Sequence, residues 1–205
     1  MKQVNKELYN FIYFCSQDRW GSYWQQLYEI VNLRPESVLE IGIRDKVIGS
    51  YIINNLEIKY LSMDIADDLK PDIIGSIDNI PLNKDAFDLV CAFEVLEHLP
   101  FEKFSVSLKE LYRVSKKYVI ISLPHWGRHF SIDIRLPFIK RLKLQVKIDP
   151  FPIKHKFNDQ HYWEIGKKEF SLKKIKNKIN SAGFIIIKDY IVFGSPYHHF
   201  FILKK

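Results

Sequence analysis

Two acidic side chains close to the ends of apolar runs have the spacing of a nucleotide-binding unit. The segment VLEIG, residues 38–42, ends an apolar run with Glu40 and Gly42 and leads into a helical pattern. A turn of this kind points backbone N–H groups at a ligand. Asp64 follows about twenty residues after the glycine, the separation expected within a βαβ nucleotide unit. The pair predicts a ligand at the carboxyl ends of neighbouring strands.

Histidines follow two later apolar runs and could supply acid–base chemistry. His98 comes after the run 87–93, and His125 comes after the run 118–123. Ligands of open α/β sheets gather at the carboxyl ends of the strands, so both imidazoles are expected close to a ligand. A positioned histidine that takes a proton contributes roughly 10²–10⁴-fold to a rate. His98 and His125 are the predicted catalytic residues, with a structural role as the alternative for each.

Alternating strands and helices must position these side chains. Short runs rich in Val, Ile, Leu, Phe and Tyr alternate with helical patterns, which predicts βα units around a parallel sheet. The predicted strands are 37–41, 59–64, 72–76, 87–93 and 118–123, followed by a pair at 184–191 and 197–203. Helices are predicted over 7–15, 22–31, 47–55 and 101–114, and a last one is capped by Ser171 and stopped by Gly183.

Four segments, taken together, resemble the class I S-adenosylmethionine-dependent methyltransferases, especially the broad group called type 11. They are VLEIG, YLSMDIA, GSIDNIPLNKDAFDLV and AFEVLEHLP, and they follow one another in the family's order between Ser37 and Pro124. The resemblance implies a Rossmann-like α/β fold, with a mainly parallel seven-stranded sheet and an antiparallel C-terminal hairpin. It also implies one domain over 1–205, with N-terminal helices in 1–36, and methyl transfer from S-adenosylmethionine.

The resemblance further implies which residues hold the cofactor. Glu40 would order the glycine loop and hold the methionine end, and the Asp64 carboxylate would accept both ribose hydroxyl hydrogens. Ser76 and Ile77 would lie against the adenine. The full set of implied cofactor-binding residues is Glu40, Gly42, Arg44, Asp64, Ile65, Ser76, Ile77, Phe93 and Glu94.

The glycine loop departs from the family pattern, which usually carries two further glycines. Arg44 and Lys46 stand at those positions. A left-handed Arg44 would cost on the order of 1–2 kcal/mol, and its side chain could obstruct the cofactor. Alternatively, its guanidinium could pair with the cofactor's carboxylate, a charge-assisted contact that would offset the strain. The sequence leaves both outcomes open.

A basic and aromatic insertion at 125–160 replaces the short connection expected after the fifth strand. Lysines and arginines alternate there with Leu, Ile, Val and Phe. This pattern predicts a surface that meets an anionic membrane or a phosphorylated acceptor, or else an amphipathic cap over the core. Within QHYWEIG, His161 and Trp163 are the predicted substrate contacts, with plain packing as the alternative for Trp163.

Composition narrows the choice of partner and compartment. The net charge of +7 favours an anionic partner, although solvated lysine explains it equally well. Cys15 and Cys91 lie far apart in apolar surroundings, which favours reduced thiols over a disulfide or a metal site. The N-terminus lacks the pattern of a secretory signal, so we expect a cytoplasmic protein. We also expect no metal site.

Three hypotheses follow for the function. The first is methyl transfer from S-adenosylmethionine to a small-molecule acceptor or to one linked to a lipid or sugar. The second is a non-catalytic binding module that keeps the methyltransferase fold, motivated by the missing glycines. The third is a nucleic-acid methyltransferase, motivated by the positive charge. A dinucleotide-dependent oxidoreductase is disfavoured because G-x-G-x-x-G is absent.

Overall fold

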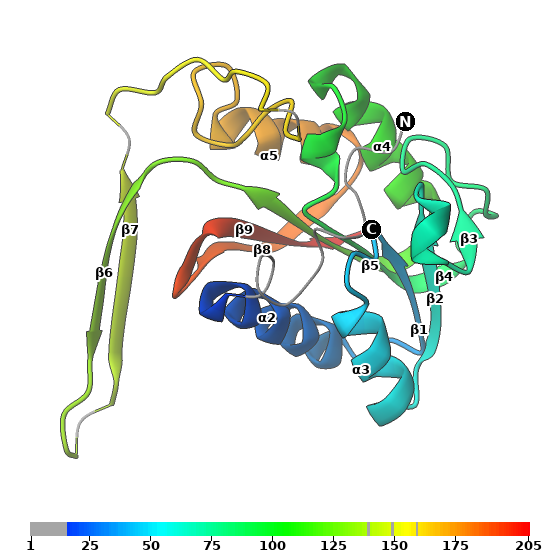
Figure 1. The fold of residues 1–205 in the computed structure, drawn as a ribbon, viewed down its shortest axis with the longest axis horizontal. Helices are drawn as coiled ribbons and strands as arrows, with labels where there is room; N and C mark the ends of the chain where they lie inside the picture. Colours follow the sequence, from blue (N-terminus) through cyan, green and yellow to red (C-terminus); the bar gives the residue numbers. More distant parts are fainter. Residues whose placement is uncertain (1–15, 139, 149, 159) are drawn as a thin grey trace.

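A seven-stranded sheet in the order β3-β2-β1-β4-β5-β9-β8 forms the centre of the protein (Figure 1). The computed structural model describes residues 16–138, 140–148, 150–158 and 160–205. The strands of this sheet are β1 Ser37–Ile41, β2 Lys59–Asp64, β3 Ile73–Ile74, β4 Phe87–Phe93, β5 Ser115–Pro124, β8 Ile185–Val192 and β9 Ser195–Lys204. Neighbouring strands from β3 to β5 are parallel, whereas β9 is antiparallel to both β5 and β8. The predicted sheet with its antiparallel C-terminal hairpin is confirmed.

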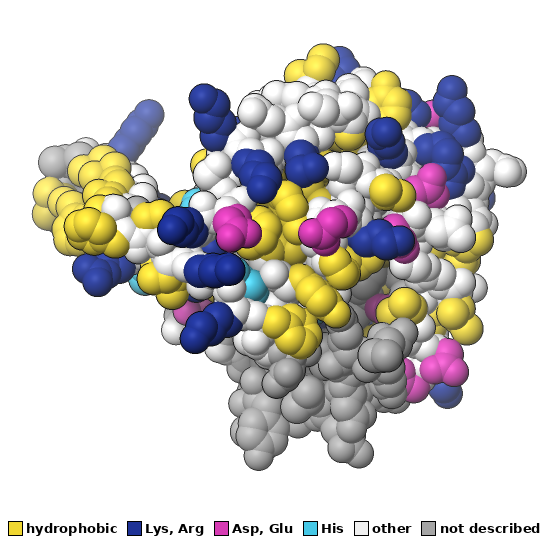
Figure 2. Space-filling model, turned by 90° about the horizontal axis from the view of Figure 1, so that it is seen from above, with side chains coloured by type: hydrophobic (Ala, Val, Ile, Leu, Met, Phe, Trp, Pro, Cys, Tyr) yellow, Lys and Arg dark blue, Asp and Glu magenta, His cyan; other side chains and the backbone are white. Residues whose placement is uncertain are grey.

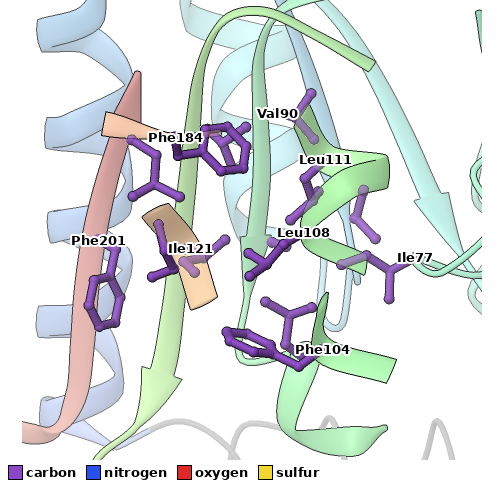
Figure 3. Packing of buried hydrophobic residues seen from close by; sticks show 14 of the residues in the cluster. Ile77, Val90, Phe104, Leu108, Leu111, Ile121, Phe184 and Phe201 are labelled. Atoms are coloured by element: carbon purple, nitrogen blue, oxygen red, sulfur yellow. The ribbon is translucent and has the colours of Figure 1, made fainter. Parts of the chain in front are cut away.

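Helices cover both faces of the sheet (Figure 1), which explains why β1 and β4 are buried along their whole lengths. One face packs against α2 Gln17–Leu33 and α3 Val47–Asn55, whose buried residues include Ile30 and Ile52. The other face packs against α4 Phe101–Val114 and α5 Leu172–Ser181. There Phe104 and Leu108 meet strand residues such as Ile121 (Figure 3). Strands buried on both sides read as continuous apolar runs, which is why the sequence located them well.

Local signals account for the helix ends. The Ser16 hydroxyl accepts the Arg19 backbone N–H at 3.2 Å and begins α2, which is longer than the predicted 22–31. Ser171 caps α5 in the same way, through the Lys174 N–H at 3.2 Å. Gly183 follows α5 with φ of 103°, a conformation that a glycine adopts without strain. The helix predicted over 7–15, with Cys15, lies outside the described residues.

The third strand is shorter than the predicted 72–76, because Asp72 is hydrogen-bonded to β2 through its side chain and is not part of the strand ladder. Its carboxylate accepts the Ser62 backbone N–H at 2.8 Å and the Ser62 hydroxyl at 2.6 Å. Pairing with β2 is confined to Ile73 and Ile74, and the chain then turns at Ser76. The loop that follows this short strand, from Gly75 on, lines a cavity at the carboxyl ends of the strands.

The insertion forms a β-hairpin that projects from the body of the protein (Figure 1). Strands β6 Arg128–Ile134 and β7 Leu142–Ile148 pair with each other in a separate two-stranded sheet. The pairs Phe130↔Val146, Ile132↔Leu144 and Ile134↔Leu142 place one row of apolar side chains on a single face. Phe130 is 62% exposed and Leu144 50% exposed, so this face does not cover the core as the cap alternative expected. Among the described helices, none combines the length and apolar character that crossing a membrane requires.

Candidate active site

A cavity of about 280 Å³ lies at the carboxyl ends of the parallel strands. The loops after β1, β2, β3 and β4 form its walls, and Tyr162 from the segment after the hairpin adds to them. Crevices at this position are the usual ligand sites of open α/β sheets. The predicted site residues that line the cavity are Gly42, Arg44, Asp64, Ile65, Ser76, Ile77, Glu94 and His98.

The carboxylate of Asp64 joins two of these loops. One carboxylate oxygen accepts the Ile43 N–H at 2.9 Å, and the other accepts the Ala66 N–H at 2.9 Å. Because β1 and β2 are adjacent and parallel, Asp64 stands beside the turn that follows β1. A carboxylate oxygen can accept more than one hydrogen bond, so Asp64 retains acceptor capacity toward the cavity.

Gly42 allows the chain to turn tightly between β1 and the cavity. Its φ is +82°, and a Cβ atom at this position would lie 2.4 Å from Cγ2 of Val95. Its N–H donates to the Met63 carbonyl at 2.9 Å, which keeps the turn against β2. Both the backbone conformation and the close approach of Val95 require glycine here.

The turn keeps its left-handed form at the two positions where glycines were missing. Arg44 has φ of +44° and Lys46 has φ of +63°. The Arg44 guanidinium donates to the Phe93 carbonyl, and its charge faces the buried Glu94 carboxyl. Burial raises the pKa of Glu94, and the charge of Arg44 opposes that rise. Arg44 is therefore held at the wall between the ends of β1 and β4.

Two of the predicted cofactor contacts have side chains that do not line the cavity. Glu40 is buried, and its carboxylate accepts the hydroxyl hydrogen of Tyr60. Burial raises the pKa of Glu40 to about 7, although the Tyr60 hydrogen bond acts in the opposite direction. The Phe93 ring packs with Phe200 in the core cluster beneath α2. Both side chains support the turn from behind, since side chains of a strand alternate between the two faces of its sheet.

A buried polar cluster stands beside the cavity. The short helix η3, Leu96–His98, places the Glu97 carboxylate 3.9 Å from Nε2 of His98. His161 lies against His98, with ring centroids 5.0 Å apart. Donor atoms of Glu97, His98 and His161 all lie within 4.8 Å of one another, which is compatible with holding a metal ion. The sequence analysis predicted no metal site, and His161 lies far from the Glu97–His98 pair in sequence, so no short ligand-spacing motif marks this cluster.

The electrostatics of this cluster follow from its burial. Burial lowers the pKa of His98 to about 4, with a further contribution from His161. Burial also raises the pKa of Glu97 well above its ordinary value, and the nearby Glu94 carboxyl adds to the rise. Glu164 behaves differently, because hydrogen bonds from His161 and Tyr197 outweigh its burial and lower its pKa.

The remaining two predicted residues lie away from the cavity. His125 shares a 2.9 Å hydrogen bond with His199, and burial lowers the pKa of His125 to about 3. Trp163 is fully buried, donates to the Leu99 carbonyl at 3.1 Å and packs against Phe104. Packing, the alternative given for Trp163, accounts for that position, and no direct contact with a ligand in the cavity follows for either residue.

Comparisons with known proteins agree with this geometry. Residues 49–123 match the family model described as a methyltransferase domain. No curated protein sequence matches the chain. The matched segment contains the strands and loops that form the cavity, apart from β1 with the turn after it and Tyr162.

Several solved structures share this fold at low sequence identity, and most of them are described as methyltransferases. DesVI of Streptomyces venezuelae is 11% identical with a TM-score of 0.61, and the match covers 98% of each chain. A S-adenosylmethionine-dependent methyltransferase from Aquifex aeolicus is 14% identical with a TM-score of 0.60, again over 98% of each chain. The 1,6-didemethyltoxoflavin-N1-methyltransferase of Burkholderia thailandensis, 12% identical with a TM-score of 0.57, is matched over 90% of this chain and 76% of its own. The matched segment and the shared fold show that this chain has a methyltransferase-like fold and is similar to S-adenosylmethionine-dependent methyltransferases.

Proposed function

We propose that S-adenosylmethionine occupies the cavity, with its ribose on Asp64. The observation that carries this proposal is the Asp64 carboxylate, which faces the cavity while it holds the Ile43 and Ala66 N–H groups. Ile65 and Ile77 both line the cavity and offer apolar surface to an adenine. Arg44 offers a guanidinium to the carboxylate of the methionine part, a charge-assisted contact.

We further propose that the acceptor enters beside Glu94, His98 and Tyr162. These side chains form the part of the cavity that belongs to the loop after β4 and the segment after the hairpin. Methyl transfer is an in-line displacement, so the protein chiefly brings the acceptor atom within about 3–3.5 Å of the methyl carbon. The polar lining favours a hydroxyl acceptor, as in a small molecule or a lipid- or sugar-linked group. Of the two histidines predicted to be catalytic, His98 is the one that lines the cavity.

Calorimetric titration with S-adenosylhomocysteine tests the cofactor site. We expect one bound molecule per chain for the wild type and a clear loss of affinity for Asp64→Ala. Asp67→Ala, an exposed acid three positions away, is the matched control and should bind as the wild type does. No binding by a folded wild type at millimolar ligand would support the binding-module hypothesis and contradict this proposal.

The projecting hairpin supports contact with an anionic membrane. Its apolar row leaves one face open, while Gln145 and Lys147 on the other face donate to the Val192 and Pro196 carbonyls at 3.3 and 2.7 Å. Basic side chains lie beside the apolar ones (Figure 2), and the loop at the tip carries Phe138 with Arg141 close by. An apolar face flanked by basic groups is complementary to a layer of anionic lipid headgroups, at about 1 kcal/mol per basic residue. The anionic cytoplasmic leaflet is the surface we propose, which places the protein in the cytoplasm.

Sedimentation with vesicles distinguishes this contact from other uses of the hairpin. We expect binding to vesicles that contain phosphatidylserine, weaker binding at high salt, and loss of binding in the double variant Phe130→Ser with Phe138→Ser. A matched control, Ile53→Ser, changes an exposed apolar residue on α3. Concentration-dependent dimerisation that the double variant abolishes, without vesicle binding, would instead assign the face to a second copy of the chain.

A further inference from the structure

Glu97 is a buried carboxylate that accepts no hydrogen bond from the described residues, although the His98 ring lies 3.9 Å away and the charge of Arg44 acts on it. Its exposed fraction is 0%, and neither of its carboxylate oxygens has a hydrogen bond. The buried Glu94 carboxyl lies close enough to raise the pKa of Glu97 further, and its own Oε1 atom also lacks a hydrogen bond. Buried carboxylates normally have hydrogen bonds, opposite charges or metal ions as partners, because desolvation is costly.

The two imidazoles beside Glu97 are oriented as metal ligands usually are. Nδ1 of His98 lies 2.9 Å from the Gln160 carbonyl oxygen. A carbonyl only accepts, so Nδ1 carries the proton and Nε2, which lies toward Glu97, carries the lone pair. Nδ1 of His161 lies 3.2 Å from the buried Glu164 carboxylate. Metal-binding histidines commonly donate their other N–H to a carbonyl or a carboxylate in this way.

We propose that Glu97, His98 and His161 bind a divalent cation at the edge of the cavity. Two imidazoles and one carboxylate suit Zn²⁺, Mn²⁺, Fe²⁺ or Co²⁺, and the set leaves open coordination positions. Donor atoms within 4.8 Å of one another require only a small contraction to reach a shared ion, since metal–ligand bonds are about 2.0–2.2 Å long. The cluster comes from two segments that meet only in the folded protein, η3 after β4 and the chain after the hairpin.

A cation at this position defines the acceptor more narrowly, and this step rests on the proposed methyl transfer. His98 lines the cavity, so the open coordination positions face the space proposed for the acceptor. A hard or borderline cation there selects oxygen, and two open positions suit the neighbouring hydroxyls of a sugar. In the transfer, the bond from methyl carbon to sulfonium sulfur breaks and its electron pair stays on sulfur. The acceptor oxygen forms the new bond to carbon, and its proton passes to water.

Metal titration of the full chain, without S-adenosylmethionine, tests the site directly. The protein is stripped with EDTA, and Mn²⁺, Co²⁺, Zn²⁺ and Mg²⁺ are titrated separately by calorimetry, with the visible spectrum followed for Co²⁺. We expect one ion per chain for at least one of the first three cations and a rise in Tm on binding. Glu97→Gln and His161→Ala should abolish it, whereas His129→Ala, an exposed histidine on the hairpin, should not change it.

A milder substitution keeps the test informative if Glu97→Gln or His161→Ala fails to fold. Glu164→Gln leaves all three ligands in place, and loss of an outer partner typically lowers metal affinity about 10–100-fold. Failure of the wild type to bind Mn²⁺, Co²⁺ or Zn²⁺ at millimolar concentration would overturn the proposal, as would unchanged binding by folded His161→Ala. A separate titration with S-adenosylhomocysteine in EDTA reports on the cofactor site, so the two proposals can fail independently.

Discussion

Replacing Asp64 by asparagine removes one of the two carboxylate acceptors that hold the loops around the cavity. The side chain keeps its size, but its amide NH₂ group must face either the Ile43 N–H or the Ala66 N–H, each of which now donates at 2.9 Å. A hydrogen bond to a charged group contributes about 1.5–3 kcal/mol, and Asp64 is only partly buried, so the lower half of that range is expected. For a chain of this size, each kcal/mol lost lowers Tm by about 2–4 °C, so we expect a decrease in Tm of roughly 3–9 °C.

Cofactor affinity should fall together with stability, because the same carboxylate is proposed to accept the ribose hydroxyls. Differential scanning fluorimetry measures the first effect, and calorimetry with S-adenosylhomocysteine measures the second. Asp67→Asn is the control, since Asp67 is exposed at the start of η2, Asp67–Leu69. An Asp64→Asn protein that melts within about 1 °C of the wild type would refute the reasoning about the loops. Unchanged affinity in a destabilised variant would refute the ribose contact alone.

Three further predictions concern the same part of the molecule. Gly42→Ala should lower the stability of the protein against urea more than Gly194→Ala does. The two glycines have similar φ angles, +82° and +86°, but only at position 42 would a Cβ atom meet Val95, at 2.4 Å. Equal losses of stability would show that Val95 moves away freely. Lys46→Gly should leave the free energy of unfolding unchanged or raise it by up to about 1 kcal/mol, because relief of the backbone strain at a left-handed lysine offsets the greater backbone entropy that glycine loses on folding. A clear loss of stability would mean that the hydrogen bond from Lys46 to the Lys70 carbonyl, at 3.2 Å, contributes more than the strain. Burial raises the pKa of Glu40 from 4.5 to about 7, so the folded chain binds this proton more tightly than the unfolded chain does. The free energy of unfolding should therefore fall by on the order of 3 kcal/mol as pH rises from about 4.5 to 7. Glu40→Gln should flatten that part of the profile of stability against pH, and an unchanged slope would assign the slope to other groups.

The sequence alone predicted the strands and helices that surround the cavity. Apolar runs have a signal that does not depend on distant residues, so β1 and β4, which are buried along their whole lengths, and the partly buried β2 were predicted with their observed bounds. The same holds for α3 and α4, whose apolar residues recur at helical spacing. Asp64 and Gly42 could be located because both follow directly from the ends of strands.

Predictions about which side chains face the cavity were less complete. Glu40 and Phe93 lie on strands, and the face of the sheet to which each side chain points is fixed only when the sheet forms. Both side chains are buried on the face away from the cavity, Glu40 beside Tyr60 and Phe93 in the core cluster. Trp163 was separated from its core partners in α4 by the whole insertion, so its burial could not be inferred from its own segment. The hairpin likewise showed the residue pattern of a cap, and only its pairing placed the apolar row on an open face.

The sequence by itself therefore determined the alternation of strands and helices, the strand-end carboxylate and the glycine turn, because these depend on local spacing and on burial from both sides. The tertiary structure alone decided that a left-handed turn persists at Arg44 and Lys46, since the surrounding contacts, and not glycine, hold that conformation. It also decided that Glu97 and His98 meet His161. These three residues come together only when the segment after the hairpin packs beside η3, and no local sequence pattern predicts that contact.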